Sequence, residues 1–152
     1  MFELIHAATF DPGAGSARGW ARIASDHAWL ADHFPGAPLL PGTVQLELCA
    51  QIAGPLAERA IAARDGVERW AVLGMVRSAS FPAACALPAE VVIDARLRRL
   101  DAAAAIVTAT CLRADTTLCR AEVVMVLQPA PPEWSAAVAA ARARVAAWTA
   151  RS

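Results

Sequence analysis

Acid–base chemistry in this chain rests on few side chains, because the sequence holds only three histidines. His33 stands directly before Phe34-Pro35-Gly36, a turn sequence that would fix the direction of the imidazole. Glu47 follows fourteen positions later, within an apolar stretch. A neutral imidazole accepts a proton near neutral pH, and a protonated carboxyl can donate one. His33 and Glu47 are therefore a candidate base and acid, whereas we interpret His6 and His27 as surface or structurally satisfied residues.

Glu47 belongs to a polar stripe on a predicted helix. Thr43, Glu47 and Gln51 recur at every fourth position among Val, Leu, Ile, Cys and Ala, so they share one helix face. One interpretation is that this face is open to solvent. The other is burial, since a central helix has little solvent side and a buried carboxylate is costly unless protonated or paired. Burial would raise the pKa of Glu47 and keep its carboxyl protonated near neutrality, as a general acid requires.

A third chemical group lies at the start of the same helix, at Pro41-Gly42-Thr43. The first N–H groups of a helix have no acceptor within it and lie at the positive end of its dipole, so they can polarise a carbonyl oxygen. Gly42 has no side chain to block that approach. A base, an acid and an oxyanion donor together suit proton abstraction next to a carbonyl.

Two strands and a loop precede this helix. Phe2–Phe10 and Ser16–Ser25 have strand character, and the turn residues between them, 11–15, predict a hairpin. The loop 32–42 is too rich in Pro and Gly for a helix or a central strand. The helix then runs from Thr43, its expected cap, to Gly66, with a kink or restart at Gly54-Pro55.

Four strand-like stretches and a terminal helix follow. The stretches are 70–81, 90–100, 103–114 and 117–128, and short breaks between the later ones predict an antiparallel meander. The last helix, from about Glu133 to Ala150, carries Trp134 and Trp148 on an apolar face, while its arginines lie elsewhere. We therefore predict one α+β domain over residues 1–152, with a six-stranded antiparallel sheet around a central helix.

Composition excludes several classes of protein. The 152 residues carry fourteen basic and fourteen acidic side chains, so no electrostatic footprint for nucleic acid or an anionic membrane exists. The chain is too apolar for disorder and has no run of about 20 apolar residues to span a membrane. So apolar a chain is expected to self-associate.

Four scattered cysteines indicate buried reduced thiols and no zinc site. The N-terminus lacks a signal peptide pattern, so we expect a cytoplasmic protein.

Residues 33–51 together form a motif that is typical of one enzyme family. It is the sequence His33-Phe34-Pro35-Gly36-Ala37-Pro38-Leu39-Leu40-Pro41-Gly42, followed by Glu47 and by Ala50-Gln51. This segment resembles the signature of the β-hydroxyacyl-acyl-carrier-protein dehydratases, the FabZ/FabA-like family of the hotdog fold. The resemblance implies a curved sheet around the central helix, with protomers paired side by side; the helix predicted at the C-terminus is an addition to this hotdog core.

The resemblance also implies roles for individual residues. His33 would remove the α proton and Glu47 would protonate the leaving hydroxyl, with the two residues meeting across a dimer interface. Gly42 would bind the thioester carbonyl, and Gln51 would orient Glu47. Thr43 and Phe34 would also contact substrate, which arrives on the phosphopantetheine arm of an acidic acyl carrier protein docked on arginines. No metal or further cofactor is implied. The partner chain would be a second copy, in a dimer or an assembly of dimers, or another hotdog chain.

Differences from the family signature concern the substrate. Asp32 stands where the family usually has glycine, and Gln45 resembles dehydratases of aryl-polyene and polyketide-type pathways. Glu at position 47, where Asp is the alternative, favours plain dehydration without isomerisation. Dehydration of 3-hydroxyacyl thioesters, in fatty-acid or polyene and polyketide-type synthesis, is therefore the expected activity. The alternatives are a hotdog acyl thioesterase and a non-catalytic subunit of a hotdog heterodimer.

Overall fold

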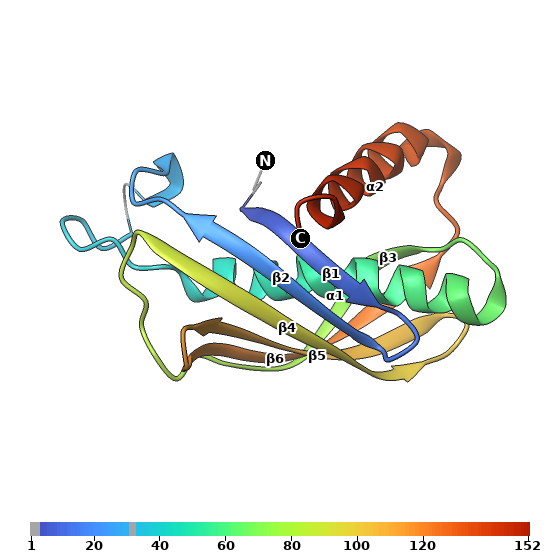
Figure 1. Cartoon of the computed structure of the whole chain (residues 1–152), viewed down its shortest axis with the longest axis horizontal. Helices are drawn as coiled ribbons and strands as arrows, with labels where there is room; N and C mark the ends of the chain where they lie inside the picture. Colours follow the sequence, from blue (N-terminus) through green and yellow to red (C-terminus); the bar gives the residue numbers. More distant parts are fainter. Residues whose placement is uncertain (1–3, 31–32) are drawn as a thin grey trace.

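One antiparallel sheet of six strands curves around a long helix, α1, in the computed structural model, which describes residues 4–30 and 33–152 (Figure 1). The strand order across the sheet is β1-β2-β4-β5-β6-β3. The strands are β1 Ile5–Asp11, β2 Ser16–Ile23, β3 Trp70–Ser80, β4 Ala89–Leu100, β5 Ala104–Arg113 and β6 Thr116–Gln128. The predicted α+β architecture, a sheet wrapped around a central helix, is confirmed.

Tight turns explain most of this topology, but one strand is not where a simple meander would place it. Hairpins join β1 to β2, β4 to β5 and β5 to β6, as predicted. In the turn after β4, the Asp101 carboxylate accepts the N–H groups of Ala103 and Ala104 at 3.0 and 2.9 Å. The meander prediction is wrong for β3, which pairs with β6 and not with β4. β4 is already flanked by β2 and β5, so β3 takes the far edge.

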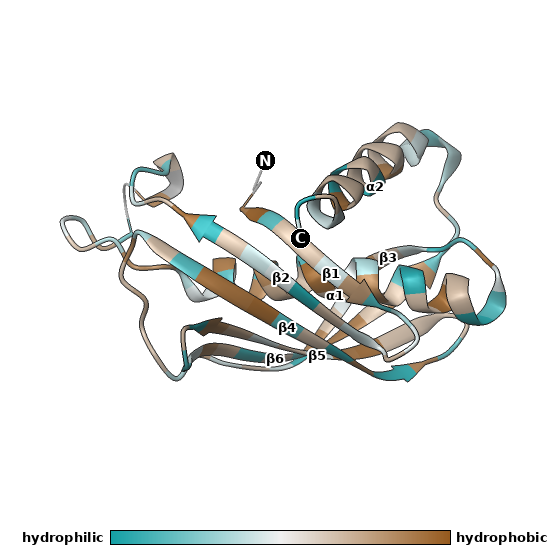
Figure 2. Ribbon diagram, in the orientation of Figure 1, coloured by the Kyte–Doolittle hydropathy of each residue, from teal (hydrophilic) through white to brown (hydrophobic). Residues whose placement is uncertain are grey.

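The central helix α1, Gly42–Asp65, packs its apolar face on the sheet. Leu48, Ile52 and Leu56 are fully buried there, and Figure 2 shows α1 and the strands around it with largely apolar colouring. Gly66 ends the helix as predicted, in a left-handed conformation (φ 68°) with its N–H on the Ala62 carbonyl. The N-terminal prediction is wrong, because Pro41 is the cap residue and Thr43 lies inside the helix. The helix also continues through Pro55 without a restart.

The C-terminal helix α2, Ser135–Thr149, lies across the outer side of α1, away from the sheet, and packs on β1 (Figure 1). Short 3-10 turns occupy Ala28–Leu30 and Pro132–Trp134. Val138 and Trp148 of α2 are buried, as the predicted apolar face requires. The prediction is wrong for Trp134, which lies in the preceding 3-10 turn and is exposed, and for Arg142 and Arg144, which line the same cavity as Val138. Within the described ranges, no helix is long and apolar enough to cross a membrane.

The interior contains all four cysteines, free and buried, as predicted. Cys111 on β5 lies opposite Cys119 on β6. Burial raises the pKa of the Cys111 thiol to about 12, and a hydrogen bond with Cys119, together with burial, raises the pKa of Cys49. Cys49 and Cys111 are therefore packing residues that hold their protons at neutral pH, whereas the hydrogen bond with Cys49 lowers the pKa of Cys119.

Candidate active site

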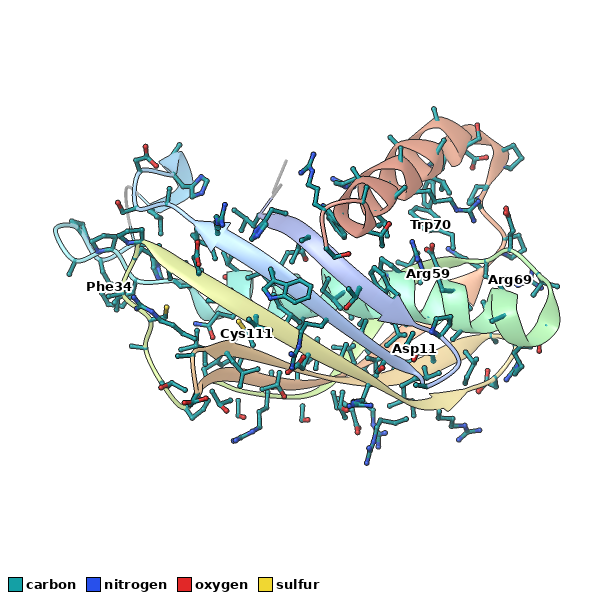
Figure 3. The ribbon with its side chains drawn as sticks, in the orientation of Figure 1. Asp11, Phe34, Arg59, Arg69, Trp70 and Cys111 are labelled. Atoms are coloured by element: carbon teal, nitrogen blue, oxygen red, sulfur yellow. The ribbon has the colours of Figure 1, made fainter. Side chains whose placement is uncertain are left out.

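The loop before α1 is a closed turn that carries His33. The Ala37 N–H donates to the Phe34 carbonyl at 2.9 Å, and Phe34 itself adopts a positive φ of 56°, rare for a residue with a side chain. His33 is half-buried, and its ring meets the Phe34 ring edge-on at 4.7 Å between centroids. Phe34 lies at the tip of this loop with its side chain largely in solvent (Figure 3). Asp32, the neighbour that departs from the family signature, lies outside the described residues.

Hydrogen bonds fix the rest of the loop against the sheet end and the helix. The Leu40 N–H donates to the Cys85 carbonyl at 2.8 Å, and the Leu87 N–H donates to the Pro38 carbonyl at 2.9 Å. From α1, the buried Gln45 side chain donates through Nε2 to the Leu40 carbonyl at 3.0 Å. Sequence reasoning treated Gln45 as a mark of substrate class, and it missed this positioning role.

The N-terminal turn of α1 presents the amide groups expected of an oxyanion site. The Pro41 carbonyl accepts the N–H groups of Val44 and Gln45, so the N–H groups of Gly42 and Thr43 precede the first helical hydrogen bonds. The Phe81 ring, which follows β3, lies against Gly42: a methyl group at position 42 would be 3.2 Å from its Cδ1 and Cε1. Phe81 therefore borders the space in front of these amides.

A side-chain hydrogen bond joins Glu47 and Gln51, which share one face of α1 as predicted. Gln51 Nε2 donates to Glu47 Oε1 at 2.8 Å. Glu47 and Thr43 are exposed and Gln51 is half-buried, so the expectation that Glu47 is buried is wrong for the single chain. The stripe faces away from the sheet, and only a further chain or a substrate could desolvate it.

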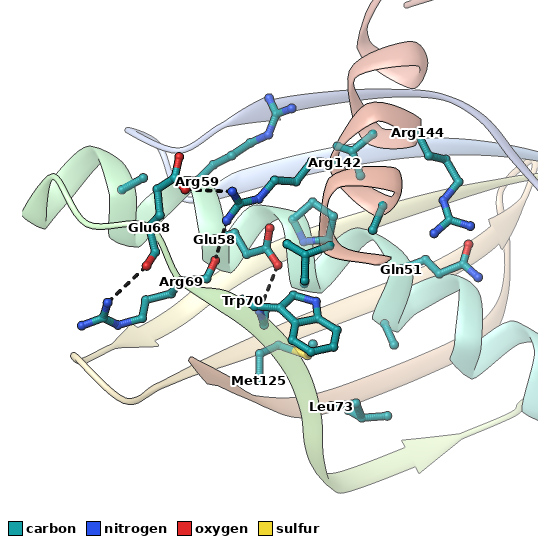
Figure 4. A pocket seen from close by; sticks show the side chains of 18 of the residues that line it. Gln51, Glu58, Arg59, Glu68, Arg69, Trp70, Leu73, Met125, Arg142 and Arg144 are labelled. Atoms are coloured by element: carbon teal, nitrogen blue, oxygen red, sulfur yellow. Dashed lines mark hydrogen bonds and ion pairs between the residues drawn. The ribbon is translucent and has the colours of Figure 1, made fainter. Parts of the chain in front are cut away.

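Glu47 lines one end of a cavity of about 610 Å³ between α1, the start of β3 and α2 (Figure 4). Ligand pockets in proteins commonly measure about 300–1,000 Å³, so the cavity is large enough for a substrate. Its far end carries Glu58, which accepts the Ala71 N–H at 2.9 Å, and Arg142, which pairs with Glu68 at 2.8 Å. Burial raises the pKa of Glu58, against smaller opposing effects of that hydrogen bond and of arginines.

The structure thus brings together some of the predicted site residues and separates others. Thr43, Glu47 and Gln51 lie along one face of α1, and Gly42 is the first residue of the same helix. No hydrogen bond or ion pair joins His33 to Glu47 in the described part of the chain. The single chain therefore presents the candidate acid and the candidate base as separate half-sites.

The other two histidines do not complete the site. His6 lies on β1. Burial lowers the pKa of His6, and the positive charge of Arg22 lowers it further, so the imidazole is neutral at pH 7. Its Nδ1 is buried and, in the parts of the chain that are described, has no hydrogen-bond partner. The interpretation of His6 as a surface or satisfied residue therefore holds only in part, because its ring is half-buried and one of its nitrogens is unpaired among the described residues. His27 lies between β2 and the 3-10 turn that begins at Ala28.

Residues 12–73, which include every predicted site residue, match the model of the ApeI-like family, described as ApeI dehydratase. The resemblance to hotdog dehydratases is confirmed over this segment. No curated protein matches the chain in sequence.

Solved structures share the whole fold at low identity. A Streptococcus mutans protein bound to acetyl CoA has a TM-score of 0.63 and 18% identity, covering 84% of this chain and 91% of its own. A conserved protein from Pseudomonas aeruginosa has a TM-score of 0.61 and 15% identity, and the match covers 78% of this chain and 84% of that protein. A mutant thioesterase from the same organism has a TM-score of 0.60 and 16% identity, and the match covers 80% of this chain and 79% of the thioesterase. These neighbours confirm the hotdog fold, and at such identities they show the fold alone.

Proposed function

We propose that this hotdog chain, similar over residues 12–73 to the ApeI-like dehydratases, dehydrates 3-hydroxyacyl thioesters carried on acyl carrier protein. The observation that carries the proposal is the Glu47 carboxyl, held by Gln51 at the end of a substrate-sized cavity and one turn beyond the Gly42 amide. Acid and oxyanion donor thus share one helix, and His33 stands on the anchored loop that leads into it.

The reaction needs only proton transfers. The His33 imidazole takes the proton from Cα of the thioester, and the electron pair of that C–H bond forms the double bond to Cβ. The Cβ–O bond breaks, and the hydroxyl leaves as water with a proton from Glu47. Gln51 donates to Oε1 of Glu47, so Oε2 is the oxygen that holds the proton and meets the substrate hydroxyl.

The α proton of a thioester is a weak acid, and the helix N-terminus addresses that difficulty. A thioester carbonyl oxygen at the N–H groups of Gly42 and Thr43 would gain negative charge in the transition state, where two donors and the helix dipole stabilise it. The absence of a side chain at Gly42 lets the Phe81 ring lie close to this turn, so Phe81 would border the bound thioester.

A second copy of the chain supplies the missing half of each site. β3 is an edge strand, and residues 73–81 are all exposed, including Leu73, Met75 and Val76. An exposed apolar edge favours pairing with another strand. Leu73 also lines the cavity that begins at Glu47, so a chain paired along β3 would cover that cavity. His33 of the partner subunit would then complete the acid–base pair.

The test is hydration of trans-2-enoyl thioesters carried on acyl carrier protein. Turnover is monitored by the loss of absorbance of the conjugated enoyl thioester. Wild-type protein should hydrate the substrate, and His33→Ala and Glu47→Gln should each lower kcat by about 10²-fold or more. Circular dichroism and sedimentation must show both variants folded, with unchanged assembly. Release of free thiol with no hydration would instead identify a thioesterase. Folded wild-type protein inactive on short, long and polyene acyl groups would identify a non-catalytic subunit.

A further inference from the structure

The C-terminal helix α2 is fixed over α1 by contacts at both of its ends. Near its start, Trp134 stacks edge-on with Trp70 of β3, 5.1 Å between ring centroids. Near its end, Trp148 is 5% exposed and joins the main core. The exposed Arg142–Glu68 pair adds little, since such pairs contribute at most about 1 kcal/mol. Burial of Trp148, together with the edge-on contact of the half-exposed Trp134, therefore holds α2 in place.

Fixed there, α2 forms one wall of the cavity that begins at Glu47 (Figure 4). The central part of this cavity is apolar, and its small or aliphatic lining residues come from three elements: Ala50, Gly54 and Pro55 of α1, Leu73 and Met125 of the sheet, and Val138, Ala141 and Val145 of α2. On α1 the lining runs from Glu47 to Ala62, fifteen positions or about 22 Å along the helix axis, and Glu58 lies within this stretch.

We infer that this cavity receives the acyl chain beyond the reacting carbons, and that α2 sets the chain length the enzyme accepts. The inference rests on the proposed function, because Glu47 would act at the third carbon of the acyl group. Carbons farther along the chain then need an apolar path that starts at Glu47, and the cavity provides one. Most charged groups lie toward the other end, where Arg142 pairs with Glu68 and Glu58 accepts the Ala71 N–H. Besides Glu47 itself, Arg144 is the exception among the described lining residues and lies on the Gln51 side (Figure 4).

Width at the middle of this path depends on small side chains. Ala141 faces the cavity from α2 and Ala50 faces it from α1. A leucine at either position would add three carbons to the space that an acyl chain would fill. Ala140, the neighbour of Ala141 on α2, is exposed and does not line the cavity, so it offers a matched control on the same helix.

The experiment measures binding of saturated acyl-pantetheines, which cannot undergo elimination, by titration calorimetry. Each methylene buried in an apolar site raises affinity about fourfold, so octanoyl-pantetheine should bind wild-type protein at least about tenfold more tightly than butyryl-pantetheine. Ala141→Leu should reduce this ratio to about threefold or less, with butyryl binding nearly unchanged. Ala140→Leu should keep the wild-type ratio. Because Ala141→Leu could loosen α2, Ala50→Leu tests the same space from α1.

The outcomes separate this inference from the proposed function. Equal affinity of wild-type protein for both acyl groups overturns the inference, as does a wild-type ratio in both folded cavity variants. A change in assembly state without a change in the ratio also overturns it, and would assign the cavity to a protein partner. Chain-length-dependent binding without any hydration activity would uphold the acyl site and contradict the dehydratase.

Discussion

Gly19 of β2 determines how closely the central helix approaches the sheet. A methyl group at this position would lie 2.5 Å from Ile52 Cδ1 and 2.8 Å from Ile52 Cγ1. Carbon atoms in contact prefer about 3.5–4.0 Å, so the side chain or α1 itself would have to move by about 1 Å. Gly19→Ala should therefore lower the free energy of unfolding by about 1–3 kcal/mol, the usual cost of overpacking a core.

A second substitution shows whether this contact is the cause. Ile52→Ala removes both contacting carbons and by itself should cost about 2–5 kcal/mol through the cavity it leaves. In that background, Gly19→Ala should be neutral or stabilising by up to about 1 kcal/mol, because alanine in a strand loses less backbone entropy than glycine.

Urea unfolding of the four proteins, at one protein concentration because of self-association, gives the coupling free energy. In thermal melts, each kcal/mol corresponds to about 2–4 °C at this chain length. If Gly19→Ala lowers the free energy of unfolding equally in both backgrounds, close packing of Ile52 on Gly19 is not what excludes a side chain at this position. Gly19 would then not determine how closely α1 approaches the sheet.

Three further predictions concern the thiols, the half-buried Glu58 carboxyl and the sheet edge. Iodoacetamide at neutral pH should leave the native thiols unmodified and label all four after denaturation, because they are buried and the pKa of Cys111 is raised to about 12; fast labelling in intact-mass spectra would contradict this. The raised pKa of Glu58 means that the unfolded chain loses this proton first, so stability falls as pH rises. Glu58→Gln should therefore gain stability relative to wild type between about pH 4 and pH 7, and a constant difference in urea midpoints would refute it. Met75→Lys with Val76→Lys should convert the assembly to monomer in sedimentation, whereas an unchanged mass would exclude β3 pairing.

Local sequence patterns were sufficient to predict most elements of this fold. The turn residues around Asp101 and the glycine at position 66 act through contacts a few residues away, so their effects are readable from sequence. The place of β3 is a long-range property, decided by which strand edges remain open once β4 has two neighbours. Thr43 fails as a cap because Pro41, with its fixed φ, already has the extended conformation that starts the helix.

The candidate site was predictable in its residues but not in its environment. The four-residue spacing of Glu47 and Gln51 implies the hydrogen bond that joins them. Exposure of Glu47 was not predictable, because the sequence pattern of a central helix does not say which of its faces awaits another chain. The contribution of α2 to the cavity wall was also missed, since Ala141 and Val145 carry no signal beyond an apolar helix face.

The most direct test of the account is complementation between two inactive variants. His33→Ala and Glu47→Gln would each be purified, unfolded together, refolded as a mixture and assayed for hydration of a trans-2-enoyl thioester on acyl carrier protein. If each site takes its base from one chain and its acid from the other, mixed dimers contain one intact site, and about a quarter of wild-type activity should return. A mixture as inactive as either variant, with mixed dimers verified by mass spectrometry, would contradict a site shared between two chains.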